Sequence, residues 1–159
     1  MVRPHLCTFN IISYFHAQTT IGMKNLILLH GALGHSDLFN PYKEVLSPHF
    51  NIHTPLFSGH GNTALPQGGI TMEQYTAELN AYCTQQGLEE VHLFGHSMGG
   101  YVALYYALQQ PGRVQSVMTL GTKFDWTEEQ ATKESKMLNP DAILEKVPKY
   151  AAQLEAQHG

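Results

Sequence analysis

Short apolar segments alternate along the chain with longer segments in which apolar residues recur every three or four positions. The short segments are bounded by glycine, proline or polar residues, which predicts β-strands at 25–31, 50–57, 90–95 and 114–121. The longer segments predict helices at 37–46, 71–87 and 98–110. Thr71 stands three residues before Gln74, the spacing of a capping box, and Gly87 stands where a helix C-cap is expected.

This order of strands and helices predicts the fold class. Strand, helix and strand in succession imply right-handed crossovers and a parallel sheet with helices on both faces. We therefore expect an α/β fold, a three-layer sandwich around a mostly parallel sheet. In such sheets ligands bind beyond the carboxyl ends of the strands. The segments expected there are HGALGHSD, LFSGHGNT, GHSMGG and GTKFDW, all rich in the residues of catalytic and binding sites.

Composition narrows the function classes. The 159 residues are 43% hydrophobic and 14% charged, as in a soluble globular domain, and the net charge of −4 gives no basic stripe for nucleic acid. No apolar run approaches the roughly 18 residues that span a membrane. Cys7 and Cys83 lie far apart without a metal-binding pattern, which favours reduced thiols in the cytoplasm. Asn10, Ser13 and His16 interrupt the N-terminal apolar stretch, so we do not interpret it as a signal peptide.

Ten histidines raise the question of a metal site. His92 and His96 are four residues apart, but on a strand that spacing covers roughly 13 Å and does not suit a shared ion. His35 and His60 border the expected cleft, where we interpret them as bonding to local backbone rather than to a metal. The segment GHGNTALPQGG lacks the third glycine and the helix start of a dinucleotide-binding loop. We expect neither a metal nor a cofactor.

The turn between the third expected strand and the third expected helix carries the strongest chemical signal. Gly95-His96-Ser97-Met98-Gly99 fits the pattern G-x-S-x-G at a strand-to-helix junction. There the serine adopts a strained conformation that holds its hydroxyl clear of the sheet, and the glycines leave room for the bend. The helix also directs its unpaired N–H groups toward negative charge beside the serine. This context favours a nucleophile over a turn that serves packing alone.

Over residues 25–121 the chain resembles the α/β-hydrolase family. LILLHGALG is similar to the family's third strand and oxyanion loop, LFSGHGNT to its RGHG-x-S loop, and VHLFGHSMGGYVAL to its nucleophile elbow. The resemblance implies that Ser97 is the nucleophile and that the backbone N–H groups of Met98 and Ala32 form the oxyanion hole, with Leu33 as the alternative second donor. The residues expected to border the substrate are His30, Gly31, Leu33 and His96.

Residues 125–159 predict two or three amphipathic helices where the family inserts its lid. Thr127 with Gln130 has capping-box spacing, and Asn139-Pro140 is a helix start signal. The apolar positions either line an acyl pocket or pack the lid onto the body; they are Leu138, Ile143, Leu144, Val147, Tyr150 and Leu154. We thus expect a hydrolase core at 23–124 and the start of a helical lid at 125–159, with residues 1–22 as an N-terminal extension or an early strand.

The sequence does not identify the base and the acid that would act with Ser97. In this family the acid and then the histidine follow the serine on later strands. The one histidine after Ser97 is His158, which we interpret as a solvated lid residue rather than the base, and Asp125 is an alternative acid position. The chain is therefore expected to stop inside its lid, to be an incompetent hydrolase by itself, and to leave an unpaired edge on the strand ending at Gly121.

The function expected from these residues is a serine hydrolase that cleaves an ester, thioester or similar acyl bond of a small molecule. Two alternatives remain: a related lyase of menaquinone biosynthesis with a GHSMGG-type elbow, and a non-catalytic receptor that binds a small ligand in the same pocket. Dehalogenases and epoxide hydrolases of this family have an aspartate as nucleophile, so Ser97 argues against them.

Overall fold

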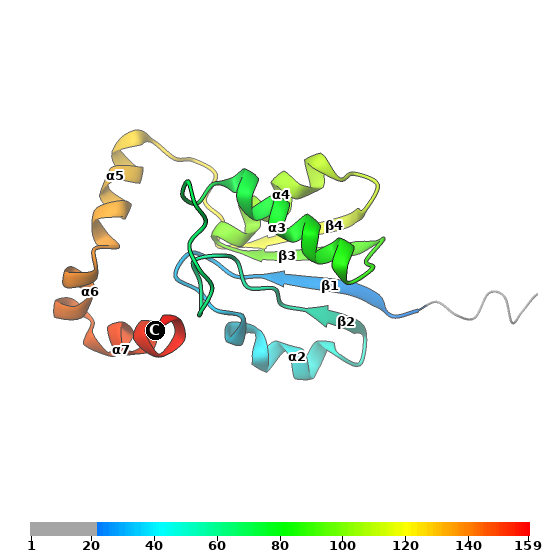
Figure 1. The fold of residues 1–159 in the computed structure, drawn as a ribbon, viewed down its shortest axis with the longest axis horizontal. Coiled ribbons are helices and arrows are strands. Elements are labelled where there is room, and N and C mark those ends of the chain that lie inside the picture. Colours follow the sequence, from blue (N-terminus) through cyan, green and yellow to red (C-terminus); the bar gives the residue numbers. More distant parts are fainter. Residues whose placement is uncertain (1–21) are drawn as a thin grey trace, which may run out of the picture.

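A computed structural model describes residues 22–159 (Figure 1). Its sheet has four strands in the order β2-β1-β3-β4, and all three pairings are parallel. The strands are β1 Lys24–Leu29, β2 Phe50–His53, β3 Val91–His96 and β4 Val114–Leu120. The predicted α/β fold with a parallel sheet is confirmed. The early strand considered for residues 1–22 lies outside the described residues, apart from Gly22.

Helices cover both faces of the sheet. Helices α3 (Met72–Gln85) and α4 (Met98–Gln109) lie on one face, and the 3-10 helix η1 (Ser36–Phe39) with α2 (Asn40–Leu46) lies on the other. Burial along β3 alternates accordingly, because successive side chains of a strand point to opposite faces. Its fully buried residues face α3 and α4, where the main core includes Ile27, Leu93 and Tyr106. The predicted three-layer arrangement is confirmed.

Two elements differ from the sequence-based expectation because of proline. The expected strand 50–57 ends at His53, two residues before Pro55, which has no N–H to donate to a sheet. The expected helix 37–46 is divided into η1 and α2, with Pro41 in the first turn of α2, where a missing N–H costs nothing. The first change leaves a longer loop at the carboxyl edge of the sheet, whereas η1 and α2 together still cover the whole expected helix.

The predicted helix ends agree more closely. The Thr71 hydroxyl accepts a hydrogen bond from the Gln74 N–H, but the Gln74 side chain donates to Glu78 instead of completing the capping box. Gly87, just beyond α3, has a φ of 65°, which glycine adopts without strain. The complete capping box between Thr127 and Gln130 is present.

Three helices follow the sheet: α5 (Glu128–Met137), α6 (Pro140–Lys146) and α7 (Pro148–His158). Figure 1 shows them as an arc beyond the carboxyl ends of the strands, with α7 returning toward the loop after β1. Of the six apolar lid positions, Ile143 is buried, Leu154 is partly buried, and Leu138, Leu144, Val147 and Tyr150 are exposed. Most of this apolar surface is therefore not packed onto the described body.

The face of the sheet next to α2 carries an open apolar groove of about 580 Å³. On this face Met118 is 67% exposed and Leu120 is 59% exposed. Within residues 22–159, β4 pairs only with β3, so the edge expected on the strand ending at Gly121 is present in this part of the chain. None of the helices in the described part of the chain combines the length and apolar character needed to cross a membrane.

Candidate active site

Ser97 occupies a strained turn between β3 and α4. Its backbone has φ 52° and ψ −116°, and Leu33 is the other non-glycine residue with positive φ in residues 22–159. The Ser97 N–H donates to the Leu120 carbonyl at 2.8 Å, and its own carbonyl accepts from the Gly100 N–H at 3.0 Å and the Thr122 hydroxyl at 2.9 Å. Such strain persists only where surrounding contacts hold it. The backbone of Ser97 is held, and these bonds leave its hydroxyl free.

The glycines on either side of Ser97 are required by close backbone contacts. A Cβ on Gly95 would lie 2.4 Å from the Gly100 nitrogen and the Gly99 carbonyl oxygen. A Cβ on Gly99 would lie 2.3 Å from the Leu29 carbonyl oxygen in β1. These contacts account physically for the two glycines of the G-x-S-x-G pattern.

The loop after β1 lies directly beside Ser97. A Cβ on Gly31 would be 3.0 Å from the Ser97 Cβ and 3.3 Å from His96 Nδ1. The Gly34 N–H donates to the Gly31 carbonyl at 3.0 Å, which closes a turn with Leu33 at φ 55°. Ala32 is exposed within this turn. On the other side of Ser97, Met98 is the first residue of α4, where the N–H has no acceptor inside the helix.

The buried His30 side chain is hydrogen-bonded to the loop after β1. Its side chain is fully buried, with Nδ1–H donating to the Gly31 carbonyl at 2.9 Å and Nε2 accepting from the Phe57 N–H at 3.3 Å. Burial lowers the pKa of His30 from 6.5 to about 4, so the ring is neutral at physiological pH. A fully buried ring offers no surface to a substrate in this arrangement, and the expected substrate contact at His30 stays a prediction. His30 links two loops.

His96 is half-buried between the Gly31 loop and the groove side of the sheet. Its Nδ1 atom is buried and has no hydrogen-bond partner within the described residues. Of the four residues expected to border a substrate, Gly31, Leu33 and His96 therefore lie around the turn next to Ser97, while His30 lies beneath it.

The loop after β2 is anchored to α3 by a carboxylate that the sequence interpretation did not single out. Glu78 accepts hydrogen bonds from the Ser58 N–H at 3.0 Å, from the Ser58 hydroxyl and from the Gln74 amide at 2.8 Å. The four-residue spacing of Gln74 and Glu78 was the available signal, because it places both on one helix face. His60 in the same loop is buried, its ring is 4.6 Å from that of His30, and burial lowers its pKa.

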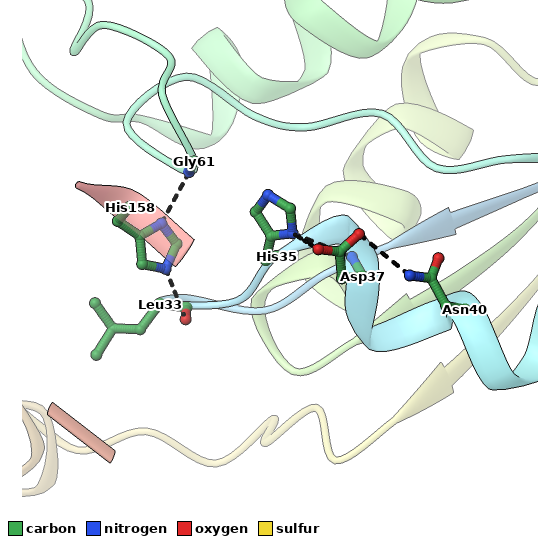
Figure 2. A network of polar contacts seen from close by, with 6 residues as sticks. All are labelled: Leu33, His35, Asp37, Asn40, Gly61 and His158. Carbon is green, nitrogen blue, oxygen red and sulfur yellow. Dashed lines mark hydrogen bonds and ion pairs between the residues drawn. The ribbon is translucent and has the colours of Figure 1, made fainter. Parts of the chain in front are cut away.

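His158 is not the solvated residue that the sequence predicted. It is partly buried at the end of α7, where its Nδ1 accepts from the Gly61 N–H at 2.8 Å and its Nε2–H donates to the Leu33 carbonyl at 3.3 Å (Figure 2). Both ring nitrogens are therefore engaged by backbone. Figure 2 also shows His35 beside Asp37, with Nδ1 3.1 Å from the carboxylate.

Asp125 is exposed in the connection between β4 and α5. Among residues 22–159 the one histidine ring nitrogen paired with a carboxylate oxygen is that of His35, beside Asp37, so the structure does not join Asp125 to a histidine. The described residues also hold no cluster of three or more histidine, cysteine, aspartate or glutamate side chains arranged to bind a metal.

Comparison with known proteins gives a consistent family assignment. A model of the alpha/beta hydrolase fold matches residues 24–154. The chain is 31% identical over 109 residues to a Mycoplasma pneumoniae protein named as an esterase/lipase. The matched segment covers 67% of this chain and 39% of that protein. The chain is 32% identical over 101 residues to the pimeloyl-[acyl-carrier protein] methyl ester esterase of Salmonella heidelberg, covering 64% of this chain and 38% of the esterase. The chain thus spans well under half the length of these relatives.

Solved structures have the same fold. A carboxylesterase structure from Nitrososphaera gargenis superposes with a TM-score of 0.69 at 20% identity, covering 83% of this chain and 49% of that one. Naproxen esterase from Bacillus subtilis superposes with a TM-score of 0.62 at 25% identity, covering 74% of this chain and 42% of that one.

Proposed function

Because the chain belongs to the alpha/beta hydrolase fold family, we propose that Ser97 is the nucleophile of a serine hydrolase that cleaves an ester or similar acyl bond of a small molecule. The observation that carries the proposal is the strained backbone of Ser97, held at φ 52° between β3 and α4 by bonds through its N–H and carbonyl. A turn that served packing alone would be equally well served by glycine, which adopts positive φ at no cost.

The surrounding amides support acyl transfer as the reaction. Attack of the Ser97 oxygen on the substrate carbonyl carbon forms a tetrahedral intermediate whose oxygen carries a negative charge. The N–H groups of Met98 and Ala32 are the proposed donors to that oxygen, and Leu33 is the alternative to Ala32. Loss of one such donor costs about 10²–10³ in rate. Expulsion of the alcohol leaves an acyl-serine ester, which water then hydrolyses to the free acid.

The proton acceptor for Ser97 is a separate requirement. The ring nitrogens of His30 and His158 are all bonded to backbone groups, which argues against either as the base in this arrangement. By the family's order of residues, the base and its acid partner follow the lid. Asp125 is the alternative acid, and its exposed position after β4 does not disfavour it sterically.

The names of two relatives support an ester as the substrate class. One is named as an esterase/lipase and another as a methyl ester esterase of an acyl-carrier-protein substrate, so an ester is the bond that they support. The apolar positions of α6 and α7, among them Leu144 and Tyr150, are candidate contacts for an acyl chain, with packing against the body as the alternative. We propose no nucleic acid or membrane partner, and a cytoplasmic location.

Labelling by a fluorophosphonate, which reacts with activated serines, tests the nucleophile. In the full gene product we expect a single labelled peptide containing Ser97 and turnover of short p-nitrophenyl esters. Ser97→Ala should abolish both, while Ser47→Ala, at an exposed position after α2, should change neither. Labelling that persists in Ser97→Ala would contradict the assignment. A folded protein that binds a small ligand but neither reacts with the probe nor turns over ester would favour the receptor alternative.

A further inference from the structure

His158 connects three segments that are remote in sequence. It stands at the end of α7, 125 residues from Leu33 and 97 residues from Gly61, and it bonds to the backbone of both. Leu33 belongs to the loop beside Ser97 and directly follows the proposed oxyanion donor Ala32, and Gly61 belongs to the loop after β2, which His30 links to it. We propose that His158, at the end of α7, is a positioning residue that clamps these two loops together only while its ring is neutral.

The directions of these two hydrogen bonds require the His158 ring to be neutral. The Gly61 N–H is a donor, so Nδ1 of His158 must be an acceptor, and the Leu33 carbonyl is an acceptor, so Nε2 must bear the hydrogen. One tautomer of the neutral ring satisfies both. In the protonated ring Nδ1 also bears a hydrogen, so two N–H groups would face each other across the 2.8 Å that separates Nδ1 from the Gly61 nitrogen. Proton uptake therefore breaks the clamp at Gly61.

Other histidine rings lie close to His158. The His35 ring on the η1 side lies 6.3 Å from that of His158, and the His60 ring in the Gly61 loop lies 6.0 Å away, with His30 behind it. A positive charge on His158 contributes to the lowered pKa of both His30 and His60, whose larger cause is burial.

The acidic groups nearby have other partners. The Asp37 carboxylate contacts His35, and that of Glu78 bonds to Ser58. On α7 itself Glu155 is exposed, one turn before His158. Glu78 partly offsets the lowering of the His60 pKa, but none of these carboxylates replaces the acceptor that the Gly61 N–H loses.

The clamp has a consequence for the proposed chemistry, and that part rests on the proposed function. Leu33 has positive φ without being glycine, so its turn needs outside contacts to persist. The His158 bond to its carbonyl is such a contact. Protonation would break the bond to Gly61 and keep the Nε2–H bond to Leu33, so His158 would then hold the turn that carries Ala32 but no longer tie it to the loop of Gly61.

Amide hydrogen exchange at Gly61, measured by NMR at pH 8 and pH 5, tests the clamp without using Ser97 reactivity. His158→Gln offers an acceptor and a donor on one amide that does not titrate, and His158→Ala offers neither. At pH 5 we expect Gly61 to exchange about tenfold faster in wild type than in His158→Gln, and at pH 8 the two should agree. His158→Ala should exchange about tenfold faster than wild type at pH 8. His49→Gln, at an exposed position, should match wild type at both pH values.

Long-range ¹H–¹⁵N spectra should show the Nε2–H tautomer of His158 at pH 8. Equal Gly61 exchange in wild type and His158→Gln at pH 5, or the Nδ1–H tautomer at pH 8, would overturn the proposal. If His158→Ala does not fold, the comparison of wild type with His158→Gln decides the matter alone. An unreactive Ser97 would leave these results unchanged, so failure of the proposed function and failure of the clamp are distinguishable.

Discussion

Substitution of Gly99 by alanine should damage the fold at the elbow, and the structure gives the size of the effect. The new Cβ would lie 2.3 Å from the Leu29 carbonyl oxygen, about 1 Å closer than an ordinary C···O contact of about 3.3–3.6 Å. That oxygen belongs to β1, which is paired with β3 at Leu29 and with β2 as far as Ile27, so it cannot retreat without disturbing the sheet. Relief of the clash therefore requires α4 to move off the sheet.

Overpacking of a tight core costs about 1–3 kcal/mol, and a rigid backbone partner favours the upper end. Alanine in place of glycine returns up to about 1 kcal/mol through helix propensity. The net loss is about 2 kcal/mol, which in a domain of this size lowers the melting temperature by about 4–8 °C.

Thermal and urea unfolding followed by circular dichroism measure this change. Gly112→Ala is the matched control, because a Cβ there meets nothing within 4 Å and the residue does not have positive φ. It should shift stability by no more than about 0.5 kcal/mol. A Gly99→Ala variant as stable as Gly112→Ala would refute the reasoning, since α4 would then have room that the structure does not give it.

Two further predictions concern buried polar groups. Burial of His30 lowers its pKa from 6.5 to about 4, so His30 is protonated in the unfolded chain before it is protonated in the folded chain as the pH falls. The free energy of unfolding should therefore decrease by about 3 kcal/mol between pH 6.5 and pH 4. Urea titrations at pH 7 and pH 4 should show a smaller decrease in His30→Asn than in wild type. An equal drop in both proteins would contradict the neutral, buried ring. Glu78→Ala should lower the free energy of unfolding by about 2 kcal/mol because it leaves the Ser58 N–H without its acceptor, and a double-mutant cycle with Ser58→Ala should give a coupling of about 1 kcal/mol or more. Additive single effects would mean that the Ser58 hydroxyl bond contributes nothing.

The elements that sequence patterns predicted well are those with local causes. The strands β1, β3 and β4 and the helices α3 and α4 lie within one or two residues of the expected bounds, because apolar periodicity and end signals act over a few residues. The G-x-S-x-G turn is local in the same way: its glycines meet backbone at fixed places whenever a strand passes directly into a helix. Pro55 and Pro41 carried the signals for the shorter β2 and the divided helix, but the apolar runs around them outweighed those signals in the sequence interpretation.

The chain's own sequence thus determined the strands and helices and the position of Ser97 at a strained turn, since each follows from neighbouring residues, and the order of these elements along the chain implied the parallel sheet. Only the tertiary structure decided which distant groups meet there. His30 became a buried anchor, because the loop after β2 covers it and supplies the Phe57 N–H. His158 reached Leu33 and Gly61 because three helices carry the chain back across the carboxyl edge of the sheet (Figure 1). Local sequence patterns indicate which face of a helix or strand is apolar. They do not indicate which distant segments come together in the fold, and those contacts determine the hydrogen-bond partners of a polar side chain.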